Sequence, residues 1–205
     1  MAGEVGHVVY AARLLTYLGD QVRTPTYWIG TLFPDIRHLG VVSRQRTHIK
    51  DITLQTLVGP NDFHTGMRVH AWIDRTREKF FLDHHIKEQL PWHPFVPFAL
   101  NLLEDEMLYD HFDDWNLISK ALATTAPEEE QYCGSVPTIK LWHTLLQDYL
   151  KRKPNNASRQ ELIHAIGLSE VAAQESNTVI TQLKKDGRAV KLLEEFWRHL
   201  EDLLR

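Results

Sequence analysis

His70 and Asp74 are the residues of this sequence whose types and spacing most directly indicate metal chemistry. On a helix, residues four apart lie on the same face, one turn from each other. An imidazole nitrogen and a carboxylate oxygen placed in this way can share a divalent ion, which both ligate at roughly 2.0–2.2 Å. A surface pair or a hydrogen-bonded histidine at the edge of the core is the alternative interpretation of the same spacing.

Further residues of the ligand type occur at intervals along the chain, in several different predicted helices. In chain order, the candidate metal ligands are His7, Asp35, His48, His70, Asp74 and Asp110. Helical proteins build metal sites from inward-pointing side chains on facing helices. Imidazole and carboxylate donors suit zinc, manganese or iron, and carboxylate-rich pairs can hold two ions. We therefore expect one or two divalent ions, and the sequence does not distinguish zinc, manganese, iron and magnesium.

Several of these candidates have a second interpretation. A buried His7 that bonds to a carbonyl would explain that residue without a metal, and Asp35 could form a local ion pair with Arg37 and His38. Asp110 lies one helical turn after Glu106, among aromatic residues. The other acids of this segment are typical of an exposed helix face: Glu104, Asp105, Asp113 and Asp114.

Phosphoester hydrolysis is the chemistry that such a set of residues would support. A bound divalent ion would lower the pKa of its water from about 15.7 toward about 7. His38 or His111 could then protonate the leaving oxygen or orient a ligand. Arg37 and Arg75 are candidate phosphate clamps, because a guanidinium fork matches phosphate oxygens. An ordinary surface role is the alternative for each arginine.

Helical periodicity predicts the elements that must position these residues. We find no alternating pattern of the strand type, no repeat and no low-complexity tract. The sequence therefore predicts an all-α fold, with seven or eight helices in a single domain over residues 1–205 and the metal site between helices. The predicted helices cover residues 4–18, from 25 onward, 63–82, 95–115, from 137 onward, 158–167, 169–186 and 189–204. Residues 123–134 are predicted to be a linker or surface excursion with a helix start at Pro127.

Composition restricts the classes of partner and compartment. The formal net charge of −4 does not indicate a nucleic-acid-binding protein, although local basic patches remain compatible with one. A single cysteine, Cys133, excludes an internal disulfide and fits a reducing compartment. Because the first residues lack a signal-peptide pattern and no segment has the composition of a membrane span, we expect a cytoplasmic protein.

Several short motifs resemble those of bacterial acyl carrier protein phosphodiesterases, which are related to the HD-type metal phosphohydrolases. Gly66–Thr76 is similar to their His-Arg-x-Ile-Asp segment, with Ala71-Trp72 where that family has two basic residues. Met107–Phe112 resembles their Trp-Asp-His-Phe motif, and Leu32–Arg37 resembles their Ala-Asp-Phe-x-Arg segment. The helix with His7 and the Phe-Trp pair near the C-terminus are similar as well, whereas residues 116–185 show no such likeness.

A weaker resemblance links the order His7, Pro34-Asp35, His48 and His70/Asp74 to zinc-dependent phospholipase C and the single-strand-specific nucleases. Those enzymes also carry a later His-x-x-x-Glu motif, for which no counterpart is assigned in this chain. The stronger resemblance implies a phosphodiesterase whose substrate is the phosphopantetheine linkage of an acyl carrier protein. Such an acidic partner would require a basic rim, for which the candidates are Arg37, Arg44, Arg46, Lys50, Arg68 and Arg75.

Two other classes of function remain open from the sequence. A helical interaction protein could retain these histidines as polar core groups after its metal site had decayed. A metal store or sensor could bind an ion without hydrolysing any substrate. Metal content and turnover of a phosphoester distinguish these alternatives from the hydrolase.

Overall fold

All regular secondary structure in the described part of the chain is helical. The computed structural model describes residues 2–19 and 24–205, and it confirms the predicted all-α class. The α-helices are α1 (Glu4–Leu18), α2 (Pro25–Leu32), α3 (Arg44–Thr47), α4 (Asp62–Asp83), α5 (Ile86–Gln89), α6 (Val96–Leu108), α7 (Trp115–Ala121), α8 (Pro127–Cys133), α9 (Val136–Leu150), α10 (Asn156–Ala165), α11 (Glu170–Asp186) and α12 (Arg188–Leu203). Three 3-10 helices join some of them: η2 (Phe33–Leu39), η3 (Leu54–Thr56) and η4 (Tyr109–His111).

The predicted count of seven or eight helices is too low. The described residues contain twelve α-helices, of which α3 and α5 have four residues each and α7 and α8 have seven each. Such short helices show less than two full turns of periodicity, so their sequences carry little amphipathic signal. The segment 95–115, predicted as one helix, divides into α6 and η4. Within the predicted linker 123–134, α8 begins at Pro127, where a helix start was predicted.

Local capping signals explain where the longer helices begin and end. Helix α1 ends at Gly19, which has a positive φ of 63°. The Asn61 side chain accepts a hydrogen bond from the His64 amide at the start of α4, and Ser169 caps α11 in the same way. These residues satisfy amide groups that the first turn of a helix leaves without partners.

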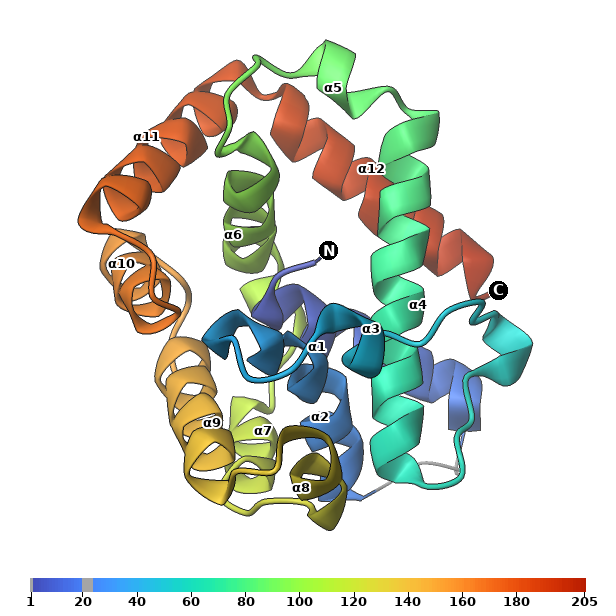
Figure 1. Cartoon of the computed structure of the whole chain (residues 1–205). Coiled ribbons are helices and arrows are strands. Elements are labelled where there is room, and N and C mark those ends of the chain that lie inside the picture. The colour runs from blue at the N-terminus through green and yellow to red at the C-terminus, as the bar shows by residue number, and fades with distance from the viewer. Residues whose placement is uncertain (1, 20–23) are drawn as a thin grey trace.

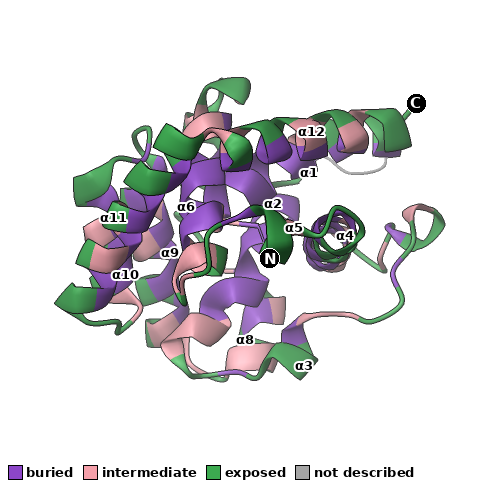
Figure 2. Cartoon of the chain, turned by 90° about the horizontal axis from the view of Figure 1, so that it is seen from above, coloured by how far each residue is buried: buried purple, intermediate pink, exposed green. Residues whose placement is uncertain are grey.

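Helices α1 and α2 lie in the middle of the molecule, between α4 on one side and α6 and α9 on the other (Figure 1). Their buried faces contribute to one apolar cluster, and Figure 2 shows the buried residues gathered toward the interior. The tightest approach is between α2 and α4. A Cβ atom on Gly30 would lie 2.0 Å from the Phe63 carbonyl oxygen, and one on Gly66 would lie 2.2 Å from the Tyr27 oxygen. Only glycine therefore allows these two backbones to touch.

Among the helices described here, none combines the length and the apolar composition that crossing a membrane would require.

Candidate metal centre

His70 and Asp74 are both buried on the face of α4 that is turned toward the core. The Nδ1 atom of His70 lies 2.9 Å from the Thr31 carbonyl oxygen, so this nitrogen carries the proton and Nε2 keeps a lone pair. Burial, and then the neighbouring His7, lower the pKa of His70 to about 3. The ring is therefore neutral near pH 7, which is the form that binds a metal ion. A histidine ligand that donates its other N–H to a carbonyl is a common arrangement in metal sites.

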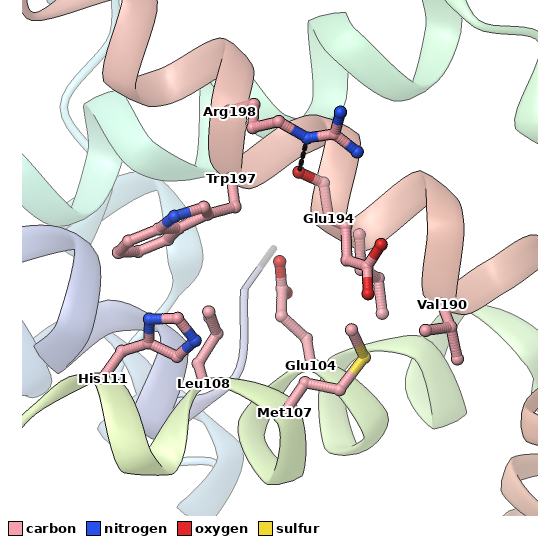
Figure 3. A pocket seen from close by; sticks show the side chains of 9 residues that line it. Glu104, Met107, Leu108, His111, Val190, Glu194, Trp197 and Arg198 are labelled. Atoms are coloured by element: carbon pink, nitrogen blue, oxygen red, sulfur yellow. Dashed lines mark hydrogen bonds between the residues drawn. The ribbon is translucent and has the colours of Figure 1, made fainter.

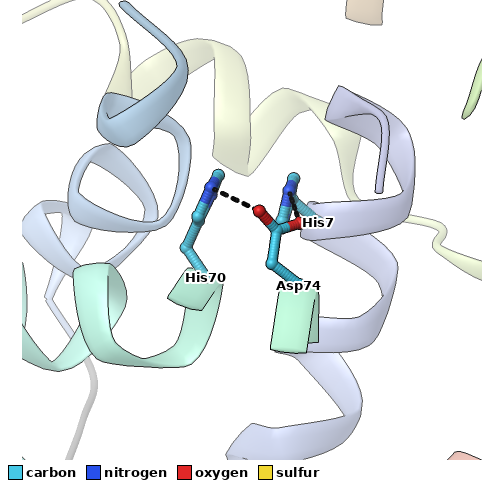
Figure 4. A group of neighbouring side chains, drawn as sticks. All are labelled: His7, His70 and Asp74. Atoms are coloured by element: carbon cyan, nitrogen blue, oxygen red, sulfur yellow. Dashed lines mark ion pairs between the residues drawn. The ribbon is translucent and has the colours of Figure 1, made fainter. Parts of the chain in front are cut away.

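His7 approaches the same point from α1. Its ring stacks on His70, with 3.7 Å between the ring centroids and 11° between the planes. The Nε2 atom of His7 lies 3.4 Å from Asp74 Oδ1, and Figure 4 shows His7, His70 and Asp74 converging from the two helices. Neither ring nitrogen of the fully buried His7 has a hydrogen-bond partner among the described residues. Such a buried polar group requires an explanation, and a bound ion would supply one.

Asp35 enters the cluster from η2, directly after Pro34 ends the regular α2 helix. Its Oδ2 atom lies 3.9 Å from His7 Nε2 and 4.0 Å from His70 Nε2. Burial alone would raise the pKa of Asp35, but the adjacent His70 and His7 hold that pKa below its usual value. The carboxylate form is thus favoured in the core.

His48 completes the cluster from the C-terminal end of α3. Its Nε2 atom lies 3.2 Å from His70 Nε2 and 3.4 Å from Asp74 Oδ2, and its Nδ1 contacts the Thr47 hydroxyl at 3.0 Å. Thr47 also donates a hydrogen bond to the Pro34 carbonyl, which ties α3 to η2. Burial would raise the pKa of Asp74, but His48 and His7 hold it well below its usual value.

The spacing of these five side chains fits a divalent ion. Their closest nitrogen and oxygen atoms lie between 3.2 and 4.0 Å apart. Two ligands that each lie about 2.0–2.2 Å from one ion are separated by roughly 3–4 Å. Two overlapping groups of three have all their ligand atoms within 4.8 Å of one another: His7, His70 and Asp74, and Asp35, His48 and His70.

Both groups contain His70, whose Nδ1 is engaged by Thr31. A single free nitrogen ligates a single ion, so the two groups cannot each bind an ion through His70. The donor set is three imidazoles and two carboxylates, without sulfur, and suits zinc, manganese or iron. The buried histidine and aspartate side chains of this centre could therefore hold a metal ion.

Comparison of the chain with protein-family models, with curated proteins and with solved structures finds no match. The side chains around the centre are therefore the basis for assigning a function.

Two predicted substrate or catalytic residues border the centre on the side of Asp35. The Nη2 atom of Arg37 lies 3.1 Å from Asp35 Oδ1, and His38 Nε2 lies 3.7 Å from the same oxygen. Arg37 Nη2 is also 3.1 Å from His38 Nε2, and because the guanidinium can only donate, this histidine nitrogen accepts. Burial lowers the pKa of His38, which favours its neutral form at pH 7.

Three other predicted site residues lie outside this cluster: Asp110, Arg75 and His111. Asp110 is exposed on η4, where its carboxylate contacts Lys153. Arg75 is exposed and faces Asp51, with 3.5 Å between Nη1 and Oδ1. Since α6 ends at Leu108, the one-turn spacing between Glu106 and Asp110 does not continue through this segment.

His111 lines a different cavity, of about 630 Å³, between the end of α6 and α12 (Figure 3). Its ring centroid lies 4.9 Å from that of Trp197. Met107, Leu108 and Leu193 contribute apolar walls to the same cavity. This position does not bring His111 together with the buried histidines and aspartates.

The prediction that Glu104 and Asp105 lie on an exposed face is wrong. Both are buried, because α6 packs against α1 and turns these acids toward polar groups of other helices. Glu104 accepts a hydrogen bond from the Tyr10 hydroxyl and pairs with Arg77. Asp105 accepts from the Gly6 amide and the Tyr149 hydroxyl. Their partners are distant in sequence, so no local pattern indicated this burial.

Glu4 is a further buried acid that sequence reasoning missed. It lies at the start of α1, close to the metal centre, and borders a cavity of about 50 Å³ together with Asp35, His38 and Asp105. Burial, and then Asp35 and Asp105, raise the pKa of Glu4 well above its usual value. An acid in the first turn is also a common feature of exposed helix ends, which is why its position alone carried no functional signal.

Proposed function

We propose that this chain is a metal-dependent phosphoester hydrolase of the phosphodiesterase type. The proposal combines the buried metal-binding geometry with the sequence resemblance to acyl carrier protein phosphodiesterases. The phosphopantetheine linkage of an acyl carrier protein is, on this proposal, the candidate natural substrate. His7, Asp35, His48, His70 and Asp74 are the residues that would hold the ion.

One observation carries most of the weight. Three imidazoles and two carboxylates meet in the core with separations of 3.2–4.0 Å, most of which exceed ordinary hydrogen-bond distances. Both nitrogens of the fully buried His7 lack a hydrogen-bond partner among the described residues, and burying a polar group in that state is costly unless something else satisfies it. A divalent ion satisfies nitrogen and oxygen donors together.

The chemistry of hydrolysis is divided between the ion and the side chains around it. A divalent ion in such a site acidifies water and so supplies a nucleophile near neutral pH. His38, neutral and with its lone pair at Nε2, would accept a proton at that atom during attack. The Arg37 guanidinium, which donates to His38 Nε2 and lies 3.1 Å from Asp35 Oδ1, would turn toward a phosphoryl oxygen and so leave His38 Nε2 open to that proton.

The decisive experiment measures metal content before activity. The protein is purified without chelator and analysed for its elements, and turnover of bis(p-nitrophenyl) phosphate is then followed with zinc, manganese, iron or magnesium added. We expect about one ion per chain and metal-dependent release of p-nitrophenol. The His70→Ala variant should lose both properties.

His164→Ala is the matched control, because His164 is exposed and pairs with Glu170 on the surface. This variant should keep the metal and the activity of the wild-type protein. A wild-type chain that binds an ion but hydrolyses no phosphoester would support a metal store or sensor. A chain that retains no ion would support an interaction protein with a decayed site.

A further inference from the structure

The side chains around the centre become more exposed in one direction, toward α3 and η2. His7 and His70 are completely buried, and the side chain of His48 is 8% exposed. The side chain of His38 is 31% exposed, and that of Arg44 is 53% exposed. Figure 2 shows α3 at the periphery of the molecule. A substrate would therefore reach the centre from this side.

Arg44 lies between the solvent and the centre. It is the first residue of α3, and its Nη2 atom lies 3.7 Å from Asp74 Oδ2. The same carboxylate oxygen lies 3.4 Å from His48 Nε2. A separation of 3.7 Å is an ion pair without the geometry of a good hydrogen bond, so the N–H groups of Arg44 are not saturated by Asp74. The bond between Thr47 and Pro34 holds the short helix that carries Arg44 against η2.

The charge at the mouth of the centre favours an anion. A divalent ion would balance the charges of Asp35 and Asp74, and Arg44 then adds a positive charge on the open side. The formal net charge of the whole chain is −4, so a positive charge at this opening would differ in sign from the net charge of the molecule.

We propose that Arg44 is a substrate-binding residue that holds a phosphoryl oxygen at the open side of the centre, together with Arg37. A guanidinium presents two parallel N–H groups that match two phosphate oxygens, and an ammonium group does not. The inference deepens the proposed hydrolase function and rests on it. It assigns the substrate to anionic phosphoesters and excludes neutral esters.

A purely positioning role for Arg44 makes a different prediction. If Arg44 served only to orient Asp74, its removal would weaken the metal and leave the affinity of the metal-loaded protein for phosphate unchanged. If Arg44 binds phosphate, its removal would leave the metal in place and lower the affinity for phosphate. Measuring both quantities on the same variants separates the two roles.

The test uses the full chain loaded with its metal and inorganic phosphate as the probe. Metal content is measured by elemental analysis, phosphate affinity by isothermal titration calorimetry, and KM and kcat with bis(p-nitrophenyl) phosphate. We expect Arg44→Gln to keep the wild-type metal content. It should bind phosphate at least about tenfold more weakly and have a higher KM, because charge-assisted hydrogen bonds are lost. Arg44→Lys should restore part of the affinity.

Arg152→Gln is the matched control, because Arg152 is 46% exposed and forms one ion pair, with Glu161, at 3.0 Å. This variant should bind phosphate as the wild-type protein does. Wild-type phosphate affinity in Arg44→Gln, or loss of metal from it, would overturn the assignment of Arg44 while leaving the hydrolase proposal intact. A wild-type chain without metal would overturn both.

Discussion

Two regions of the molecule bury histidine together with a carboxylate, and they differ in how the atoms are matched. Between α8 and α9, His143 Nε2 lies 2.8 Å from Glu129 Oε1, and His143 Nδ1 lies 3.1 Å from the Leu122 oxygen. The second oxygen of Glu129 accepts from the Ala126 amide at 2.8 Å. In the metal centre the corresponding separations are 3.2–4.0 Å.

This difference shows that residue types alone do not identify a metal site. At His143 every polar atom has one partner at hydrogen-bond distance, and the pair needs nothing further to be stable in the core. In the metal centre the nitrogen and oxygen atoms form two overlapping groups of three that are spaced like ligands of an ion. The first arrangement is structural, and the second is suited to binding.

The largest expected effect is on metal binding. Asp74→Asn should lower the affinity for the divalent ion by more than about 100-fold, because loss of a direct ligand should exceed the 10–100-fold typical of outer partners. Titration with zinc or manganese against a competing chelator measures this change. Glu129→Ala, measured in parallel, should retain the wild-type affinity. Equal affinities in all three proteins would remove the distinction between the two regions.

Glu129→Ala should instead destabilise the fold. Removing Glu129 leaves His143 buried with an unmatched nitrogen and removes the bond to the Ala126 amide. Breaking a buried pair by deleting one partner costs about 3–5 kcal/mol in the free energy of unfolding. Urea unfolding monitored by circular dichroism checks the value. A cost below about 1 kcal/mol would show that the pair is not structural.

Asp105 extends the comparison, because it is a buried carboxylate that accepts hydrogen bonds from an amide and a hydroxyl. Burial raises its pKa to about 7, against the hydrogen bonds from Gly6 and Tyr149. In the unfolded chain an aspartate releases its proton near pH 4. The folded state therefore binds this proton more tightly than the unfolded chain does. The resulting contribution to the free energy of unfolding is complete below about pH 4 and is lost as the pH rises through about 7.

The expected loss is on the order of 2–3 kcal/mol between about pH 5 and pH 8 in chelator-treated protein. The Asp105→Asn variant should lack this component, so its stability relative to the wild-type protein should rise over the same range. Urea unfolding of both proteins at the two pH values provides the difference. Parallel pH profiles would mean that Asp105 is ionised in the folded state throughout.

The smallest effect is expected at Asp110. This side chain is exposed and pairs with the half-exposed Lys153, so Asp110→Asn should change the stability by less than about 0.5 kcal/mol. Metal content and phosphodiesterase activity should both stay at the wild-type level. A loss of metal in this variant would extend the centre beyond the five converging residues.

Much of the helical framework was predictable from local signals. Gly19, Asn61, Ser169 and Gly187 mark ends of helices in the sequence, and the structure places helix boundaries at each of them. The pairing of His70 with Asp74 followed from the period of one helix. These features depend on neighbours within a few residues, which is the range over which sequence patterns are informative.

Contacts between distant segments were not predictable in the same way. The one-turn relation between Glu106 and Asp110 assumed a continuous helix, but α6 ends at Leu108 and a 3-10 turn directs Asp110 to the surface. The burial of Asp105 could not be predicted from its sequence neighbours, because its partners, Gly6 and Tyr149, are 99 and 44 residues away. The pair of His143 and Glu129 also carries no motif that marks it.

The glycine contact between α2 and α4 holds together two segments that carry residues of the centre. Because the backbones touch at Gly30 and Gly66, no side chain between the helices can yield to change their separation. Asp35 follows α2 directly, and Thr31 holds His70. The distance across the centre is thus set by the main chain. We expect selection by ionic radius: ions with bonds of about 2.0–2.2 Å fit, and calcium, with oxygen ligands at about 2.3–2.6 Å, is rejected.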